Sequence, residues 1–230
     1  MTDFLSRSLL ITRPFQDSVE VSKEIDRLNK SVNVVFGPLF EIETLPIQIS
    51  FSNIQALIVT SSNAVKSLSN SEISFDGPMY CIGSATSDLA SKLGFSVISA
   101  NGNSLDLKNL VVRLTNNKSG KLLYFRGEEV FSDIAGYLRD LSYCVDEIIC
   151  YKKVKLKLGK NIVEGINNRQ ILGATFFSRQ TVNLFFEQVT SVPKDFIAFC
   201  ISEEVSKAFD SHCTKSFSNI RISKSPNLRE

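Results

Sequence analysis

The chain has 230 residues, of which 43% are hydrophobic and 22% are charged, and its formal net charge is +2 at pH 7. This composition excludes a disordered chain and gives enough apolar residues for two small folded domains. The near-neutral charge provides no broad electrostatic field for nucleic acid or a membrane surface, so an anionic partner has to be bound by local geometry.

Two residue types exclude further classes of site. The single histidine, His212, lies in a polar segment, so neither a histidine-based zinc site nor a Ser–His–Asp triad is expected. The five cysteines form no CxxC pair, and four lie in apolar or amphipathic runs, which favours reduced thiols. No apolar run approaches the roughly 20 residues of a membrane span, and the N-terminus lacks the pattern of a signal peptide. We expect a soluble, cytoplasmic protein that binds no metal.

The first predicted unit is a strand followed by a helix. Leu9 to Thr12 have the pattern of a short buried strand, which Arg13–Pro14 end. Asp17 followed by Glu20 resembles a capping box at the start of a helix. The apolar face of this helix holds Val21, Ile25 and Leu28. Val32 to Ile42 then form an extended connector.

A second type of unit begins at Ala56 to Val59, a predicted strand. The polar residues Thr60 to Asn63 follow it, and they are good N-cap residues for the next helix. Met79 to Ile82 form another strand, and Gly83 to Thr86 form the turn into a helix. The apolar face of that helix holds Ala85, Leu89 and Leu93, and the segment 95–100 supplies a further strand.

The second half of the chain repeats this order. Leu122 to Phe125 form a strand, Arg126–Gly127 a turn that corresponds to Arg13, and Val145 to Val154 a second extended connector. The helix between them has an apolar face of Ile134, Leu138 and Leu141. Later, the segments 174–189 and 198–209 resemble the second type of unit, with Ser178 in the place of Ser61 and Ile201 in the place of Ile82.

Strands that alternate with helices predict an α/β fold with doubly wound parallel sheets. Three arrangements of these units remain open. They are one long sheet, two domains in series, or two domains of which the first is interrupted by the second. The third arrangement requires that the two extended connectors pair with each other.

Six segments, taken in order from Leu9 to about Phe209, resemble uroporphyrinogen-III synthase. Each motif is weak alone, but six in register are specific. The segments are "LLITRP", "LIVTSSNAVKSL", "YCIGSATSDLASKLGF", "LLYFRGEE", "VDEIICYKKV" and "ATFFSRQTVNLF". The resemblance implies two α/β domains, joined by a two-stranded linker, with the active site in the cleft between them. The implied ranges are 1–36 with 154–230 for domain one, 41–149 for domain two, and 37–40 and 150–153 for the linker.

The resemblance also implies a reaction. Members of the family are lyases that close the linear tetrapyrrole hydroxymethylbilane to uroporphyrinogen III, inverting the last pyrrole ring, without metal or organic cofactor. A hydroxyl leaves, an azafulvene forms, and a spiro intermediate then rearranges. The substrate is expected to come from porphobilinogen deaminase by a transient hand-over, and the protein is expected to be a monomer.

The acetate and propionate groups of such a substrate call for helix N-termini and arginines as ligands. The expected substrate-binding residues are Arg13, Ser61, Ser62, Asn63, Gly83, Ser84, Ala85, Arg126, Gly127, Ser178, Arg179 and Ser202. Tyr151 and Thr86 are the catalytic candidates. Tyr151 matches the family's cleft-facing tyrosine and is expected to assist departure of the hydroxyl. The competing interpretations are plain helix caps, solvated arginines and a tyrosine that only packs.

Two departures from the family pattern limit the resemblance. In "ISEEVS", Ser202 replaces a glycine and Val205 a threonine, and the glutamates between them are expected to face solvent. The chain also ends at Glu230, where relatives usually continue into a final helix, so either domain one is trimmed or that helix is absent, and the effect on activity is left open. The alternatives are a non-catalytic bilobed tetrapyrrole or anionic-ligand binder and a flavodoxin-like nucleotide or flavin binder. The chain has neither a GxGxxG motif nor a P-loop, which counts against the nucleotide or flavin binder.

Overall fold

The computed structural model describes residues 7–28, 31–213, 217 and 219–223, and the expectation of a missing final helix concerns residues outside this part. The chain divides into two compact units. Unit 1 consists of Met1–Glu41 and Val154–Glu230, and unit 2 of Ile42–Lys153. The chain therefore leaves unit 1 within one strand, β3 (Phe40–Thr44), and returns within another, β8 (Val145–Lys155), and these strands are neighbours in a sheet.

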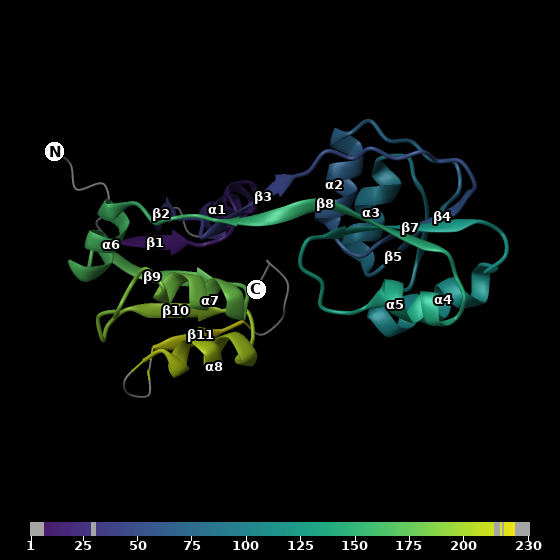
Figure 1. Ribbon diagram of the computed structural model, residues 1–230. Coiled ribbons are helices and arrows are strands. Elements are labelled where there is room, and N and C mark those ends of the chain that lie inside the picture. Colours follow the sequence, from purple (N-terminus) through teal and green to yellow (C-terminus); the bar gives the residue numbers. More distant parts are fainter. Residues whose placement is uncertain (1–6, 29–30, 214–216, 218, 224–230) are drawn as a thin grey trace. The chain divides into compact units, whose positions relative to one another are not determined.

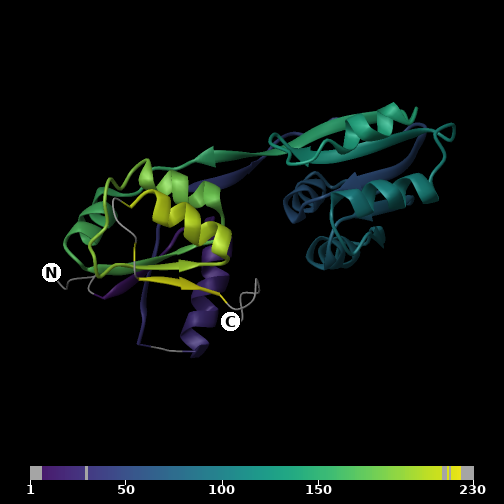
Figure 2. The same ribbon diagram turned by 90° about the horizontal axis from the view of Figure 1, so that it is seen from below.

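Unit 1 is a parallel sheet with helices on both faces (Figures 1 and 2). Its strand order is β11-β10-β9-β1-β2. The strands are β1 (Ser8–Ile11), β2 (Asn33–Phe36), β9 (Ile171–Phe176), β10 (Ile197–Cys200) and β11 (Ile220–Ile222). The helices are α1 (Phe15–Leu28), α6 (Lys160–Asn167), α7 (Arg179–Phe186) and α8 (Glu203–Ser211). In Figure 2, α7 and α8 cover one face of this sheet and α1 lies on the other.

Aromatic side chains fill the core beneath α7 and α8. The rings of Phe185 and Phe209 each lie 5.2 Å from that of Phe176, and all three side chains are fully buried. Burial of large apolar side chains stabilises such a core by roughly 1.5–3 kcal/mol per residue. The apolar face of each helix is thus the reason why it packs on the sheet.

Unit 2 repeats the architecture with the strand order β3-β8-β7-β4-β5-β6, in which the five strands after β3 are parallel. Its remaining strands are β4 (Ile54–Val59), β5 (Pro78–Cys81), β6 (Ser96–Ser99) and β7 (Lys121–Gly127). Its helices are α2 (Ser62–Asn70), α3 (Ser84–Lys92), α4 (Ser104–Leu114) and α5 (Ile134–Asp140). Two separate cores result, because α2 and α3 pack on one face and α4 and α5 on the other (Figure 1).

The predicted α/β class with parallel sheets is confirmed, but two local predictions are wrong. The helix α1 begins at Phe15, so Asp17 lies in its first turn and binds Arg13 at 2.7 Å instead of capping the helix. Glu41 caps the helix instead, because its carboxylate accepts the backbone N–H of Phe15 at 2.7 Å. Arg126–Gly127 is not a turn, because pairing with β8 continues β7 to Gly127.

Three structural facts bear on the classes of site that the sequence excluded. In the part of the chain that the structure describes, no helix is long and apolar enough to cross a bilayer. The same residues hold no group of three or more His, Cys, Asp or Glu side chains placed to bind a metal ion. All five cysteines are free; Cys81, Cys150 and Cys200 are buried, Cys213 is partly buried and Cys144 is exposed.

Candidate functional site

A cavity of about 470 Å³ lies at the carboxyl ends of β4, β7 and β8 in unit 2. Ligands of open α/β sheets bind at this end of the strands. Five of the residues expected from the sequence line the cavity, namely Ser61, Asn63, Arg126, Gly127 and Tyr151. They come from three segments that are distant in the sequence, and the parallel sheet brings them together.

The N-terminus of α2 forms one wall of the cavity. Ser61 is the N-cap, and its Oγ accepts the backbone N–H of Asn63 at 3.1 Å. Thr60, one residue earlier, has its Oγ1 3.3 Å from the hydroxyl of Tyr124. Backbone N–H groups in the first turn of a helix favour an anion, by about 0.3–1 kcal/mol where the site is exposed. This wall therefore presents hydroxyl and amide groups to a ligand.

Two tyrosines contribute hydroxyl groups to the cavity. Burial raises the pKa of Tyr151 above its usual value, and a hydrogen bond with Ser61 partly offsets this shift. Burial also raises the pKa of Tyr124, which the hydrogen bond with Thr60 partly offsets. Both hydroxyls are therefore protonated at neutral pH and are able to donate a hydrogen bond.

Gly127 makes room for the ring of Tyr151. A Cβ added at Gly127 would lie 2.7 Å from Cζ of Tyr151 and 3.0 Å from its hydroxyl. Carbon atoms in contact are usually separated by about 3.5–4.0 Å, so no larger residue fits without moving the ring. Gly127 therefore has a structural role that the sequence did not indicate, since it leaves the space that the Tyr151 ring occupies. Its expected role in binding substrate is a separate one.

Arg126 lines the cavity but is held by unit 2 itself. Its Nε donates to Glu147 at 2.8 Å, and its Nη1 donates to the carbonyls of Gly127 at 2.9 Å and Glu128 at 3.1 Å. Glu147 also accepts a hydrogen bond from Arg139 at 2.9 Å. This network fixes the direction of the guanidinium and offsets part of its charge.

The turn that begins α3 does not line the cavity. Gly83 is the N-cap, with φ at 72°, a conformation that favours glycine. Ser84 and Ala85 are exposed, whereas Thr86 is buried with its Oγ1 3.4 Å from the Oγ of Ser62. The four residues 83–86 therefore lie beside the first turn of α2, and Thr86 reaches the cavity residues only through its neighbour.

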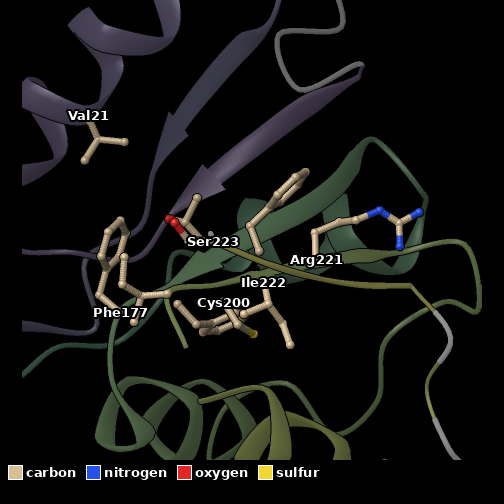
Figure 3. A pocket seen from close by; sticks show the side chains of 10 residues that line it. Val21, Phe177, Cys200, Arg221, Ile222 and Ser223 are labelled. Atoms are coloured by element: carbon tan, nitrogen blue, oxygen red, sulfur yellow. The ribbon is translucent and has the colours of Figure 1, made fainter. Parts of the chain in front are cut away.

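Unit 1 has a cavity of its own, of about 250 Å³, at the carboxyl ends of β9, β10 and β11 (Figure 3). Its lining is mainly apolar and includes Phe176, Phe177 and Phe199. The guanidinium of Arg221 points away from the other labelled side chains in Figure 3. None of the four candidates from unit 1, which are Arg13, Ser178, Arg179 and Ser202, is among its lining residues.

Those four candidates have other partners. Arg13 pairs with Asp17, and its guanidinium carbon lies 4.6 Å from the centre of the Phe177 ring. Arg179 lies 3.4 Å from Glu204, which is exposed together with Glu203, as expected.

The two serines are helix caps. Ser178 accepts the N–H of Thr181 at 3.1 Å, and Ser202 accepts that of Val205 at 3.4 Å. Ser202 is thus the N-cap of α8, although the family pattern has a glycine at this position. In unit 1 the candidates are therefore held in local pairs and caps, outside the lining of the 250 Å³ cavity.

The unit 2 cavity also has lining side chains that the sequence did not single out as site residues, among them Tyr124, Phe131 and Lys153. Two signals were available. Tyr124 lies in the same segment as Arg126, and Lys153 lies two residues after Tyr151 on one strand, where alternate side chains share a face. Phe131 lies in the loop between β7 and α5, and no periodic pattern marks it.

The sequence matches the family described as uroporphyrinogen-III synthase HemD over residues 22–229. None of the curated proteins matches it significantly. Among solved structures, the uroporphyrinogen-III synthetase from Helicobacter pylori is 16% identical with a TM-score of 0.64, and the alignment covers 96% of this chain and 94% of that chain. A mutant uroporphyrinogen III synthase from Thermus thermophilus is 11% identical with a TM-score of 0.58, covering 97% and 95%. At these identities the structural likeness shows the fold alone.

Proposed function

Because the chain belongs to the uroporphyrinogen-III synthase family, we propose that it cyclises hydroxymethylbilane to uroporphyrinogen III with inversion of the last pyrrole ring. The enzyme is a lyase that needs no cofactor and acts as a cytoplasmic monomer. Porphobilinogen deaminase supplies its substrate by a transient hand-over.

One observation carries this proposal for the site. Five of the candidate residues line a single cavity in unit 2, at the edge of the sheet where ligands bind. The cavity presents hydroxyl groups, amide groups and cations, which suit a ligand with many carboxylates. It contains few strong acids or bases, and that fits a reaction in which the enzyme mainly controls the conformation of a reactive chain.

Tyr151 is the group that we assign to departure of the substrate hydroxyl. Its raised pKa keeps it protonated, so it donates a hydrogen bond to the leaving oxygen and stabilises the negative charge that develops there. Ser61 and Gly127 hold the ring in place, the first by its hydrogen bond and the second by the space that it leaves. Thr86 acts through Ser62, as a positioning residue for the first turn of α2.

The remaining candidates bind the substrate carboxylates. In unit 2 these are Asn63, Arg126 and the turn 83–86, whose backbone N–H groups begin α3. In unit 1 they are Arg13, Arg179 and the two capping serines, Ser178 and Ser202. The local pairs of the arginines are partly exposed and are worth about 0–1 kcal/mol, so a substrate carboxylate is able to replace them.

The coupled assay with porphobilinogen deaminase tests this function. Hydroxymethylbilane cyclises without help to the type I isomer, in which the last ring is not inverted. Adding the protein should therefore convert the product to the type III isomer, which chromatography separates from type I. Type I product alone would refute the synthase, and tetrapyrrole binding in that case would indicate a non-catalytic homologue.

A further inference from the structure

The loop between β7 and α5 presents two apolar side chains beside the unit 2 cavity. Phe131 is 99% exposed and Val130 is 45% exposed, and both line the cavity. A single exposed apolar residue needs no explanation in a folded protein. A fully exposed aromatic ring at the rim of a cavity that also holds hydroxyls and cations is different, because the ring contributes almost nothing to the core and its exposed face is able to stack on a ligand.

Both ends of this loop are fixed. The N–H of Glu128 donates to the carbonyl of Tyr151 at 3.0 Å, and Arg126 donates to the carbonyl of Glu128 at 3.1 Å. At the other end, Asp133 caps α5 by accepting the N–H of Gly136 at 2.7 Å. The position of Phe131 therefore follows from contacts on both sides of it.

A lysine lies next to this ring. The Nζ of Lys153 is 6.0 Å from the centre of the Phe131 ring, at the outer limit of a cation–π contact, and 3.8 Å from the carboxylate of Glu129. The Glu129 side chain is 61% exposed. An ion pair with so exposed a partner is worth about 0–1 kcal/mol, so a ligand carboxylate is able to take the place of Glu129 at little cost.

We propose that Phe131 and Lys153 form a ring clamp, in which one pyrrole ring of the substrate stacks on Phe131 and a carboxylate on that ring binds Lys153. The clamp rests on the proposed function for the identity of its ligand. Its chemistry matches each part of an acetate- and propionate-bearing pyrrole: an aromatic face for the ring and a cation for the side arm. Glu129 competes with the substrate for Lys153.

The test is the affinity of the full chain for uroporphyrin III, the oxidised form of the proposed product, measured by calorimetry. Phe131→Ala should weaken binding about tenfold, since stacking on an aromatic side chain is worth about 1–3 kcal/mol. Lys153→Gln should weaken it about fivefold and reduce its dependence on salt. Glu129→Gln should strengthen it about twofold, because the competing carboxylate is removed. If these residues had a purely structural role, one substitution would not strengthen the binding of uroporphyrin III while the others weaken it.

Two matched variants serve as controls. Lys152→Gln removes a neighbouring lysine that pairs with Glu43 at 3.1 Å and does not line the cavity. Leu114→Ala removes an apolar side chain of the same unit, 49% exposed, at the end of α4. Both should bind uroporphyrin III as the wild type does.

The outcomes separate the clamp from the proposed function. Weakened binding in Phe131→Ala and Lys153→Gln with unchanged controls supports the clamp, even if the wild type yields only type I product and the synthase is refuted. If the wild type makes type III product but both variants bind uroporphyrin III normally, the clamp is wrong and the function stands. A wild type that does not bind uroporphyrin III also overturns the clamp.

Discussion

Unit 1 and unit 2 have the same architecture, yet their cavities differ in chemistry. Both cavities lie at the carboxyl ends of parallel strands. All five tyrosines of the chain belong to unit 2, whereas twelve of the seventeen phenylalanines belong to unit 1. The unit 2 cavity accordingly has tyrosine hydroxyls and cations among its apolar lining residues, whereas the unit 1 cavity is lined mainly by apolar side chains and has no tyrosine among its described residues.

The topology of the sheet thus determines where a ligand can bind, and the side chains at the strand ends determine the chemistry of that site. The capping serines illustrate the point. Ser61 and Ser178 occupy equivalent positions and both cap a helix, but Ser61 lines the unit 2 cavity, whereas Ser178 is not among the residues that line the unit 1 cavity. In the proposed reaction the chemistry belongs to unit 2, and the predictions that follow test this proposal.

The largest effect is expected for Tyr151→Phe. Loss of the hydroxyl should lower turnover by about a hundredfold, because a positioned proton donor contributes about 10²–10⁴-fold. Steady-state kinetics of the coupled reaction measures the change, and circular dichroism checks that the fold is intact. Tyr143→Phe is the control, since its hydroxyl donates to the carbonyl of Thr115 at 3.2 Å, away from the cavity. Equal turnover in the two variants would remove the assignment of Tyr151.

A somewhat smaller effect is expected for Gly127→Ala. The added Cβ displaces the Tyr151 ring, so turnover should fall about tenfold, since even a small misplacement of a catalytic group is costly. Gly94→Ala is the matched control. Its φ of 89° makes the substitution strained, but no atom lies within 4 Å of the added Cβ, so stability should fall while turnover is kept. Full activity in Gly127→Ala would show that the ring position does not matter.

High pH should act on unit 2 through its tyrosines. Burial raises the pKa of Tyr80, Tyr124 and Tyr151 from 10.0, so the unfolded chain loses these protons first and the free energy of unfolding falls as the pH rises above about 10. Below that pH the neutral forms prevail in both states. A spectrophotometric titration of tyrosinate should therefore show a late phase in the folded chain that urea removes. A single phase at the ordinary pKa would contradict the burial of these rings.

The smallest effect is expected for Arg221→Gln in unit 1. This exposed side chain lines the apolar cavity, and turnover should stay within about twofold of the wild type, as for most surface substitutions. Steady-state kinetics of Arg221→Gln and Tyr151→Phe under the same conditions compares the effects of the two substitutions on turnover. A tenfold loss would mean that the two cavities share the chemistry.

Much of the fold could be predicted from local patterns. The polar run before the apolar face of α2 predicted a helix cap, which Ser61 provides, and the repeat placed Ser178 in the corresponding position, where it also caps a helix. The capping box of α4, made by Asn103 and Asp106, was also in the sequence but was not used, and α4 was missed. The start of α1 was not predictable from its own residues, because its cap comes from Glu41, far along the chain.

The site could be predicted only in part, for a similar reason. Motifs with a known family pattern found Ser61, Arg126 and Tyr151. Lys153 shares a face of β8 with Tyr151 and was within reach of the sequence, whereas Phe131 depends on the course of the loop between β7 and α5, which no local pattern states. The same applies to the network that holds Arg126, since Glu147 approaches it from the adjacent strand.

The most direct test of the assignment to unit 2 is the share of type III isomer formed by paired variants of the two cavities. With Tyr151→Phe the product should shift toward the type I isomer, because spontaneous closure overtakes the slowed enzyme. With Arg221→Gln the type III isomer should remain dominant, as in the wild type. Equal isomer shares in the two variants, or type I product alone from the wild type, would contradict the account.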